Sequence, residues 1–174
     1  MRGLSGRDQV ERFMRALGQA VRQPTRVYLT GGASAVLLGW RETTIDVDLT
    51  FVPETDEVFQ AIARLKDELG INVELVAPSH FIPPLPGWET RSGFIRQEGP
   101  VSFYHYDFYS QALAKIERAH AQDESDVAEM LKSGAVEPER LLTLFETIAA
   151  DLHRYPALNP ESFRRSLRKT LARS

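Results

Sequence analysis

A pair of aspartates inside an apolar run is the feature that most constrains how this chain folds. Residues 45–52 read IDVDLTFV, a β-rich run that Pro53 ends. Side chains alternate along a strand, so Asp46 and Asp48 lie on one face and within reach of the same ion. Two neighbouring carboxylates repel, which makes the arrangement costly without a cation between them. Oxygen ligands at this spacing suit Mg²⁺, although one aspartate facing solvent at a strand end explains the pattern as well.

A glycine pair lies shortly before these aspartates. Residues 26–30 (RVYLT) form a short β-rich run, which Gly31 and Gly32 interrupt. The following segment, 33–40 (ASAVLLGW), is small and apolar, as expected of a short helix buried against a sheet. Backbone N–H groups at such a helix start can hold a phosphate, and the Ser34 hydroxyl can add a contact. Glycine pairs also simply turn the chain, so the indication comes from the turn and the aspartate strand together.

A third carboxylate follows on the next strand-like run. Residues 71–76 (INVELV) predict a strand in which Asn72 and Glu74 share one face. Glu74 completes a three-carboxylate site if this strand lies beside the strand of the two aspartates. The same glutamate also fits an edge-strand charge that blocks aggregation, and both interpretations stay open.

The order of the remaining elements predicts an α/β chain with a helical second half. Apolar residues recur at helical spacing over 6–23 and 57–69, so strands and helices alternate up to residue 76. Five of the ten prolines fall in 77–100, which predicts a long loop with a short strand around 94–96, before a strand at 101–106. The expected domains are an α/β core over 1–107 and a helical region packed on it over 108–174. The expected helices of that region are 109–121, 124–133, 137–152 and 160–172.

Composition excludes several classes of protein. The 174 residues include no cysteine, which excludes disulfide scaffolds, thiolate zinc sites and thiol catalysis. No apolar run is long enough to cross a membrane and the N-terminus does not resemble a secretory signal, so we expect a cytoplasmic protein without a membrane partner. Residues 1–26 and 161–174 each carry a net charge of +4, and the stretch between them −11. This pattern fits an acidic metal site flanked by surfaces for a polyanion, or simply solvated helix faces.

Two segments resemble a known superfamily. Residues 27–51, VYLTGGASAVLLGWRETTIDVDLTF, resemble the glycine turn and paired aspartates of the DNA-polymerase-β-like nucleotidyltransferases. Within that superfamily the chain is most similar to the minimal bacterial enzymes around the AbiEii-type toxins, which include the mycobacterial MenT toxins. Residues 112–131, ALAKIERAHAQDESDVAEML, resemble the lysine-bearing helix and later aspartates of those enzymes. The implied fold class is α/β (α+β), a mixed sheet with flanking helices followed by a C-terminal helical half.

The resemblance implies a catalytic set. Asp46 and Asp48, with Glu74 as the inferred third ligand, would hold Mg²⁺ or Mn²⁺ on a nucleoside triphosphate. Lys115 would contact phosphate, and Asp123 or Asp126 would position Lys115 or act near the nucleophile. From the residues alone, the lysine and its neighbouring arginine equally fit an ordinary i, i+3 pair on a helix surface.

The resemblance also implies residues that contact the nucleotide. These are Gly31, Gly32, Ser34, Arg41, Thr44, Lys115 and Arg118. Many members of the superfamily have Gly-Ser at the turn, whereas here the serine stands only at position 34. Which hydroxyl meets a phosphate is therefore left open.

The implied activity is magnesium-dependent transfer of a nucleoside monophosphate from a triphosphate, such as ATP, to an acceptor. The subtype implies the toxin of a toxin–antitoxin pair, with tRNA as the acceptor and a cognate antitoxin protein as partner. Transfer to a protein or a small molecule would use the same metal site. A catalytically silent binding module or antitoxin that kept the fold is the alternative from a different class.

Overall fold

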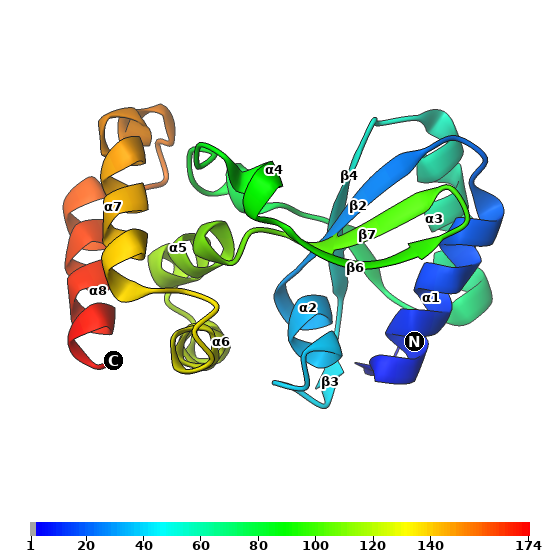
Figure 1. The fold of residues 1–174 in the computed structure, drawn as a ribbon, viewed down its shortest axis with the longest axis horizontal. Helices are drawn as coiled ribbons and strands as arrows, with labels where there is room; N and C mark the ends of the chain where they lie inside the picture. The colour runs from blue at the N-terminus through cyan, green and yellow to red at the C-terminus, as the bar shows by residue number, and fades with distance from the viewer. Residues whose placement is uncertain (1–2) are drawn as a thin grey trace. The chain divides into compact units, whose positions relative to one another are not determined.

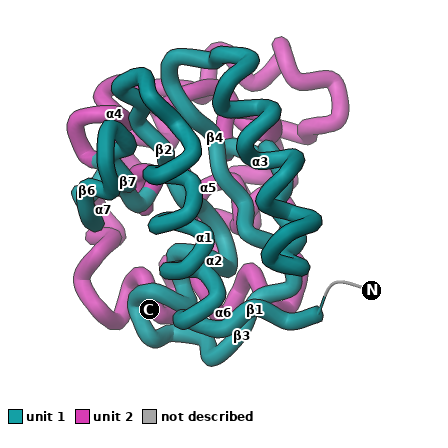
Figure 2. Tube along the Cα trace, turned by 90° about the vertical axis from the view of Figure 1, so that its right-hand side faces the viewer, with its two compact units in different colours: residues 1–77, 92–105 teal, residues 78–91, 106–174 magenta. Residues whose placement is uncertain are grey.

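A computed structural model describes residues 3–174, which form two compact units (Figure 2). The first unit holds residues up to Ala77 together with Ser92–His105, and the second holds Pro78–Arg91 together with Tyr106–Ser174. The sequence predicts one division at residue 107. The structure differs in the segment Pro78–Arg91, which belongs to the second unit although it precedes two strands of the first.

The first unit is a mixed sheet with three helices. Its central sheet has the strand order β5-β4-β2-β7-β6, and β1 pairs with β3 in a separate two-stranded ribbon. Strand β2 runs antiparallel to β4 and parallel to β7, while β4 and β5 are parallel to each other. This arrangement confirms the α/β (α+β) fold class. The elements of the unit are β1 (Ser5–Gly6), α1 (Arg7–Ala20), β2 (Thr25–Thr30), α2 (Gly31–Leu37), β3 (Thr43–Thr44), β4 (Val47–Val52), α3 (Asp56–Leu69), β5 (Val73–Leu75), β6 (Gly93–Glu98) and β7 (Val101–His105).

Alternation along the strands separates an apolar face of the sheet from a polar one. On β4, Val47, Leu49 and Phe51 are buried in the core, whereas Asp48 and Thr50 lie on the opposite face and are only half-buried. Helices α1 and α3 lie side by side and pack on the apolar face (Figure 1). Their contribution to the core is Val10, Phe13, Met14, Leu17, Val58, Ala61, Ile62 and Leu65. The polar face of β4 is thereby left to carry the two aspartates.

Helix α3 ends at the glycine that the sequence predicts. Gly70 has φ +62°, a left-handed conformation that glycine adopts without strain, and the Ile71 N–H donates to Lys66 O at 3.2 Å. The Thr55 side chain caps the other end by accepting a hydrogen bond from the Val58 N–H. The turn at Gly70 leads directly into β5, the strand that carries Glu74.

The second unit is helical. This confirms the helical second half, whose predicted helices differ from the observed ones by a few residues at their ends. None of the helices in residues 3–174 is long and apolar enough to span a bilayer. The elements are η1 (Pro78–His80), α4 (Trp88–Arg91), α5 (Phe108–Arg118), α6 (Ala121–Lys132), α7 (Pro138–Ile148), η2 (Ala149–Arg154) and α8 (Pro160–Ala172), where η marks a 3₁₀ helix.

Contacts around Asp107 explain why Pro78–Arg91 belongs to the helical unit. The buried Asp107 carboxylate caps α5 by accepting hydrogen bonds from the Tyr109 and Ser110 N–H groups. Arg91 donates to both oxygens of the same carboxylate, at 3.1 and 2.8 Å. A charge-assisted bond at both oxygens fixes the guanidinium geometry, which anchors this proline-rich segment at the start of α5.

Candidate metal and nucleotide site

Three carboxylates of the first unit meet on neighbouring strands. Asp48 lies opposite Thr30 on β2 and opposite Glu74 on β5 in the strand register. Asp46 stands one residue before β4, on the same face as Asp48. One carboxylate oxygen from each of Asp46, Asp48 and Glu74 lies within 4.8 Å of the others. The three residues singled out from the sequence are therefore together at one end of β4 and β5.

Backbone and side-chain contacts orient Asp46. The Asn72 side-chain amide donates to Asp46 Oδ1, and the Val47 N–H donates to Asn72 O at 2.8 Å. From the other side, the Thr44 hydroxyl donates to Asp46 O at 2.9 Å. The sequence places Asn72 on the same strand face as Glu74 but by itself indicates no role for it, and this shared face was the signal for its contact with Asp46.

Glycine is required at positions 31 and 32 because other side chains of the site lie very close to the backbone there. Helix α2 begins at Gly31, directly after β2 and without an intervening loop. Gly31 has φ +60°, and a Cβ there would lie 3.0 Å from Asp48 Oδ2. A Cβ on Gly32 would overlap Thr44 Oγ1 and lie 2.9 Å from Arg41 Nη1. The two glycines therefore let the start of α2 lie against Asp48, Thr44 and Arg41.

Ser34 joins α2 to the ends of two strands. Its hydroxyl is buried and donates to Leu29 O at 3.0 Å. His105 Nδ1, at the end of β7, lies 2.9 Å from Ser34 Oγ. Because the serine hydrogen is directed at Leu29, the histidine is the donor in this contact, which fixes the tautomer with hydrogen on Nδ1. Burial lowers the pKa of His105 from 6.5 to about 4, so the ring is neutral near pH 7.

A second cluster of predicted residues lies in the helical unit. Lys115, on α5, is 7% exposed, and its Nζ lies 2.8 Å from Asp126 Oδ2 and 3.4 Å from Asp123 Oδ1. Arg118 Nη2 lies 2.8 Å from Asp123 Oδ1, and Arg118 Nε donates to Asp123 Oδ2 at 3.1 Å. The lysine is therefore held between two aspartates of α6 and is not part of an exposed helix-surface pair.

The cations around Asp123 favour the ionised form of its carboxyl group. Burial raises the pKa of the Asp123 carboxyl, but the hydrogen bond from Arg118 and the charges of Lys115 and Arg118 outweigh that effect. The pKa of Asp123 consequently lies below its ordinary value. At neutral pH, Asp123 therefore acts as a negative anchor for both cations.

The chemistry of the first cluster fits a hard divalent cation. All three side chains offer carboxylate oxygens, and two of them are half-buried while Glu74 is exposed. Mg²⁺ prefers a few carboxylate ligands and keeps sites open for water and substrate phosphates. Asp46, Asp48 and Glu74 are thus suited to hold Mg²⁺ or Mn²⁺ with room for a nucleotide, and their assignment as metal ligands remains a prediction.

Comparison with known proteins places the chain in a family. The mixed sheet with paired aspartates after a glycine turn defines the class as nucleotidyltransferase-like. A family model described as "Nucleotidyltransferase of unknown function (DUF6036)" matches residues 8–166. Because this match covers most of the 174 residues, the chain belongs to that family. Searches of the curated proteins and of the solved structures gave no match.

The neutral, half-buried His105 makes the free energy of unfolding depend on pH. Its pKa is about 4 in the folded chain, below the ordinary 6.5, so the unfolded chain binds more protons between these values. The contribution of His105 to the free energy of unfolding is fully present above pH 6.5. It is lost as the pH falls through 4, by about 3 kcal/mol in total. In His105→Asn, the amide can still donate to Ser34 but does not titrate. Urea unfolding of this variant should show a correspondingly weaker loss of stability on acidification than the wild type.

The exposed His153→Asn variant serves as the control, because its pH profile should match the wild-type profile. If His105→Asn and the wild type lost stability in parallel between pH 7 and pH 4, the assignment of a neutral His105 with a lowered pKa would be wrong.

Removing the buried lysine should destabilise the helical unit. Lys115→Met leaves the buried carboxylate of Asp126 without its lysine, which costs about 3 kcal/mol when a buried ion pair loses one partner. Lys132→Met, at an exposed position on α6, should change the unfolding free energy by less than about 0.5 kcal/mol. Chemical denaturation followed by circular dichroism measures both. Equal stability of the two variants would contradict the buried-pair interpretation.

Proposed function

We propose that this protein is a magnesium-dependent nucleotidyltransferase, which transfers a nucleoside monophosphate from a nucleoside triphosphate to an acceptor. The observation that carries the proposal is the meeting of Asp46, Asp48 and Glu74 beside the start of α2. Membership in a family described as nucleotidyltransferases supports the same class of reaction. A silent binding module would have no need to keep three mutually repelling carboxylates together.

In the proposed reaction, an acceptor hydroxyl oxygen bonds to the α-phosphorus of the triphosphate. The bond from that phosphorus to the bridging oxygen of the β-phosphate breaks, and pyrophosphate leaves. Mg²⁺ bound by Asp46, Asp48 and Glu74 would orient the triphosphate and neutralise charge on the leaving group. Glu74 is the exposed member of the three, so it is the carboxylate best placed to accept the proton of the incoming hydroxyl.

The protein's own contacts hold this arrangement in place. The Asn72 amide holds the Asp46 carboxylate, and the Thr44 hydroxyl holds the Asp46 backbone carbonyl. The carboxylate is therefore oriented before any substrate binds. Gly31 and Gly32 allow the triphosphate-binding side of α2 to lie close to Asp48. The buried Ser34 hydroxyl, engaged by Leu29 and His105, supports the strand ends that carry the site.

The cations of α5 supply the proposed phosphate contacts. Asp123 and Asp126 hold the Lys115 ammonium in a defined position, and Asp123 also holds Arg118. An ammonium acts on a phosphate as a compact point charge, whereas a guanidinium can bind two oxygens at once. We assign Lys115 to a phosphate contact, with Arg118 and Asp123 in support.

We further propose tRNA as the acceptor and a toxin–antitoxin pair as the setting. Helix α8 carries Arg164, Arg165, Arg168 and Lys169 within two turns, and a basic helix of this kind neutralises phosphates. Its contribution to acceptor binding should weaken as salt concentration rises. A cognate antitoxin would be the protein partner of such an enzyme.

A labelling screen tests the proposal. The purified protein is incubated with Mg²⁺ and each α-³²P-labelled nucleoside triphosphate, together with total tRNA, with protein extract, or alone. Label should appear on tRNA, and the double variant Asp46→Asn, Asp48→Asn should reduce the rate at least about a hundredfold, because the charges that stabilise the transition state are lost. Glu54→Gln, which removes one exposed carboxylate charge outside the three-carboxylate cluster, serves as the control and should keep the wild-type rate.

The other outcomes of the screen test the identity of the acceptor and the transfer reaction separately. Label on protein would support the proposed transfer reaction and would show that the acceptor is a protein and not tRNA. If no acceptor were labelled and calorimetry found no magnesium-dependent binding of any nucleoside triphosphate, the proposed activity would be wrong and a silent binding module would replace it.

A further inference from the structure

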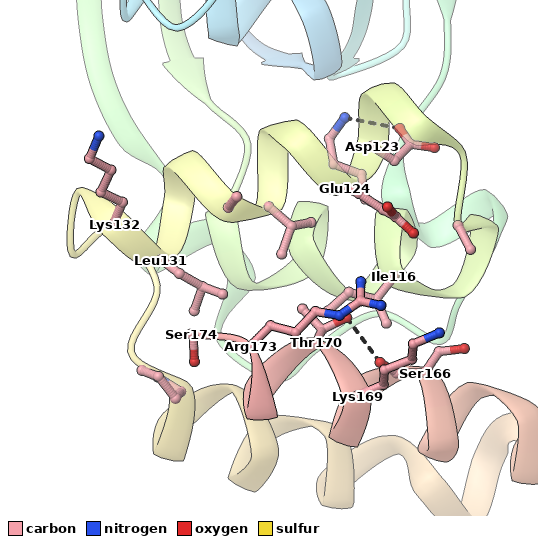
Figure 3. A pocket seen from close by; sticks show the side chains of 15 residues that line it. Ile116, Asp123, Glu124, Leu131, Lys132, Ser166, Lys169, Thr170, Arg173 and Ser174 are labelled. Carbon is pink, nitrogen blue, oxygen red and sulfur yellow. Dashed lines mark hydrogen bonds and ion pairs between the residues drawn. The ribbon is translucent and has the colours of Figure 1, made fainter.

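The helical unit contains a groove that is lined by its own residues. It is a cavity of about 670 Å³ bordered by α5, α6 and α8, within the size range of protein ligand sites, about 300–1,000 Å³ (Figure 3). Every residue that lines it lies between Lys115 and Ser174, so the groove is built within one compact unit.

The floor of the groove is aliphatic. The apolar side chains that line it are Ile116, Ala119, Val127, Ala128, Leu131 and Pro138. Ile116 and Val127 are almost fully buried, whereas Ala119 and Ala128 are exposed and too small to fill the space above them. No aromatic ring lines the groove. Nucleobases bind preferentially on aromatic rings, so an aliphatic floor favours aliphatic side chains of a polypeptide over bases.

The rim of the groove is basic. Three cations line it, namely Lys132 at the end of α6, Lys169 on α8 and Arg173 directly after α8. Within residues 3–174, none of the three forms an ion pair. In Figure 3, the Arg173 side chain extends into the space between α8 and α6. The acids on the rim are Asp123, which Lys115 and Arg118 already neutralise, and Glu124. The rim therefore has an excess of positive charge.

We propose that this groove binds an acidic amphipathic helix of a partner polypeptide. The apolar face of such a helix would cover the aliphatic floor, and its carboxylates would meet Lys132, Lys169 and Arg173. Helices are commonly recognised in this way, through apolar residues at i, i+3, i+4 and i+7 that enter a hydrophobic groove. The charge complementarity selects an acidic helix and disfavours a basic one.

Two features make the groove more than a passive surface. Lys115 and Asp123 themselves line it, so an occupant would lie against the ion-pair cluster that positions the lysine. Helix α6 also carries Asp126, the other partner of Lys115. Peptide binding here does not require transferase activity, although the groove shares Lys115, Asp123 and Lys169 with the residues assigned to the proposed function.

A peptide-binding experiment on the full chain tests the proposal. The probe is a fluorescein-labelled peptide of about 14 residues with leucines at helical spacing and glutamates on its flanks. Fluorescence anisotropy should detect saturable binding that weakens at high salt, and the Ile116, Val127 and Leu131 methyl NMR signals should shift. A peptide of the same composition in scrambled order, and one with lysine in place of glutamate, should each bind at least about tenfold more weakly.

Matched variants locate the site. The pair Lys169→Glu, Arg173→Glu should weaken binding at least about tenfold, whereas Arg165→Glu, Arg168→Glu makes the same charge change on α8 outside the groove and should have a much smaller effect. Ala128→Gln should fill the groove and weaken binding without a change in charge, whereas the exposed Ala121→Gln, also on α6, should leave it unchanged.

Three results would overturn the proposal. One is equal affinity for the ordered and scrambled peptides. Another is a single-stranded RNA oligonucleotide that binds more tightly than the peptide and shifts the same methyl signals. The third is self-association of the purified chain that Ala128→Gln abolishes, which would assign the groove to a second copy.

Discussion

The repulsion among three carboxylates is the constraint on which the candidate site depends. Asp46, Asp48 and Glu74 each place an oxygen within 4.8 Å of the others. Charges of the same sign repel one another at such distances, which makes the arrangement unfavourable unless a cation lies between them. A bound divalent cation converts that repulsion into attraction. The core on the opposite face of β4, with Val47, Leu49 and Phe51, holds the strands in register against the repulsion.

The same constraint accounts for the residues around the carboxylates. Gly31 and Gly32 are needed because Asp48, Thr44 and Arg41 approach the start of α2 more closely than a Cβ would permit. Hydrogen bonds from Asn72 and Thr44 then fix Asp46. In the helical unit, the charges are instead balanced within the cluster, since Lys115 and Arg118 offset Asp123 and Asp126. The carboxylate cluster of the first unit has an excess of negative charge that a bound cation can balance. In the cluster around Lys115, the two aspartates instead hold the two cations in place.

Local patterns in the sequence were sufficient for the fold class and for the positions of most elements. The alternation in residues 45–52 placed both aspartates on one face, and Gly70 marked the end of α3. Glu74 lies beside Asp48 only because β4 and β5 are paired. The sequence does not establish this pairing, whereas the observed register places Glu74 opposite Asp48. The catalytic and metal-binding roles of these residues remain predictions.

Long-range contacts explain what the sequence did not reveal. Prolines in 77–100 predicted a long loop with a short strand around 94–96, and β6 confirms that strand. The sequence did not reveal that Pro78–Arg91 joins the helical unit, where Arg91 binds Asp107. Similarly, the sequence alone indicates no role for His105, the last residue of β7, and only the distance to Ser34 shows that it supports α2. The two-residue strands β1 and β3 are too short to produce a periodic pattern.

The most direct test of the central claim is a crystal structure of the protein with Mn²⁺ and a non-hydrolysable nucleoside triphosphate. The account predicts an anomalous Mn²⁺ peak at coordination distance from oxygens of Asp46, Asp48 and Glu74, with the triphosphate on the same ion. The peak should disappear in Asp48→Asn. A nucleotide bound elsewhere, or a manganese peak that survives this substitution, would contradict the assignment of the three carboxylates as the metal site.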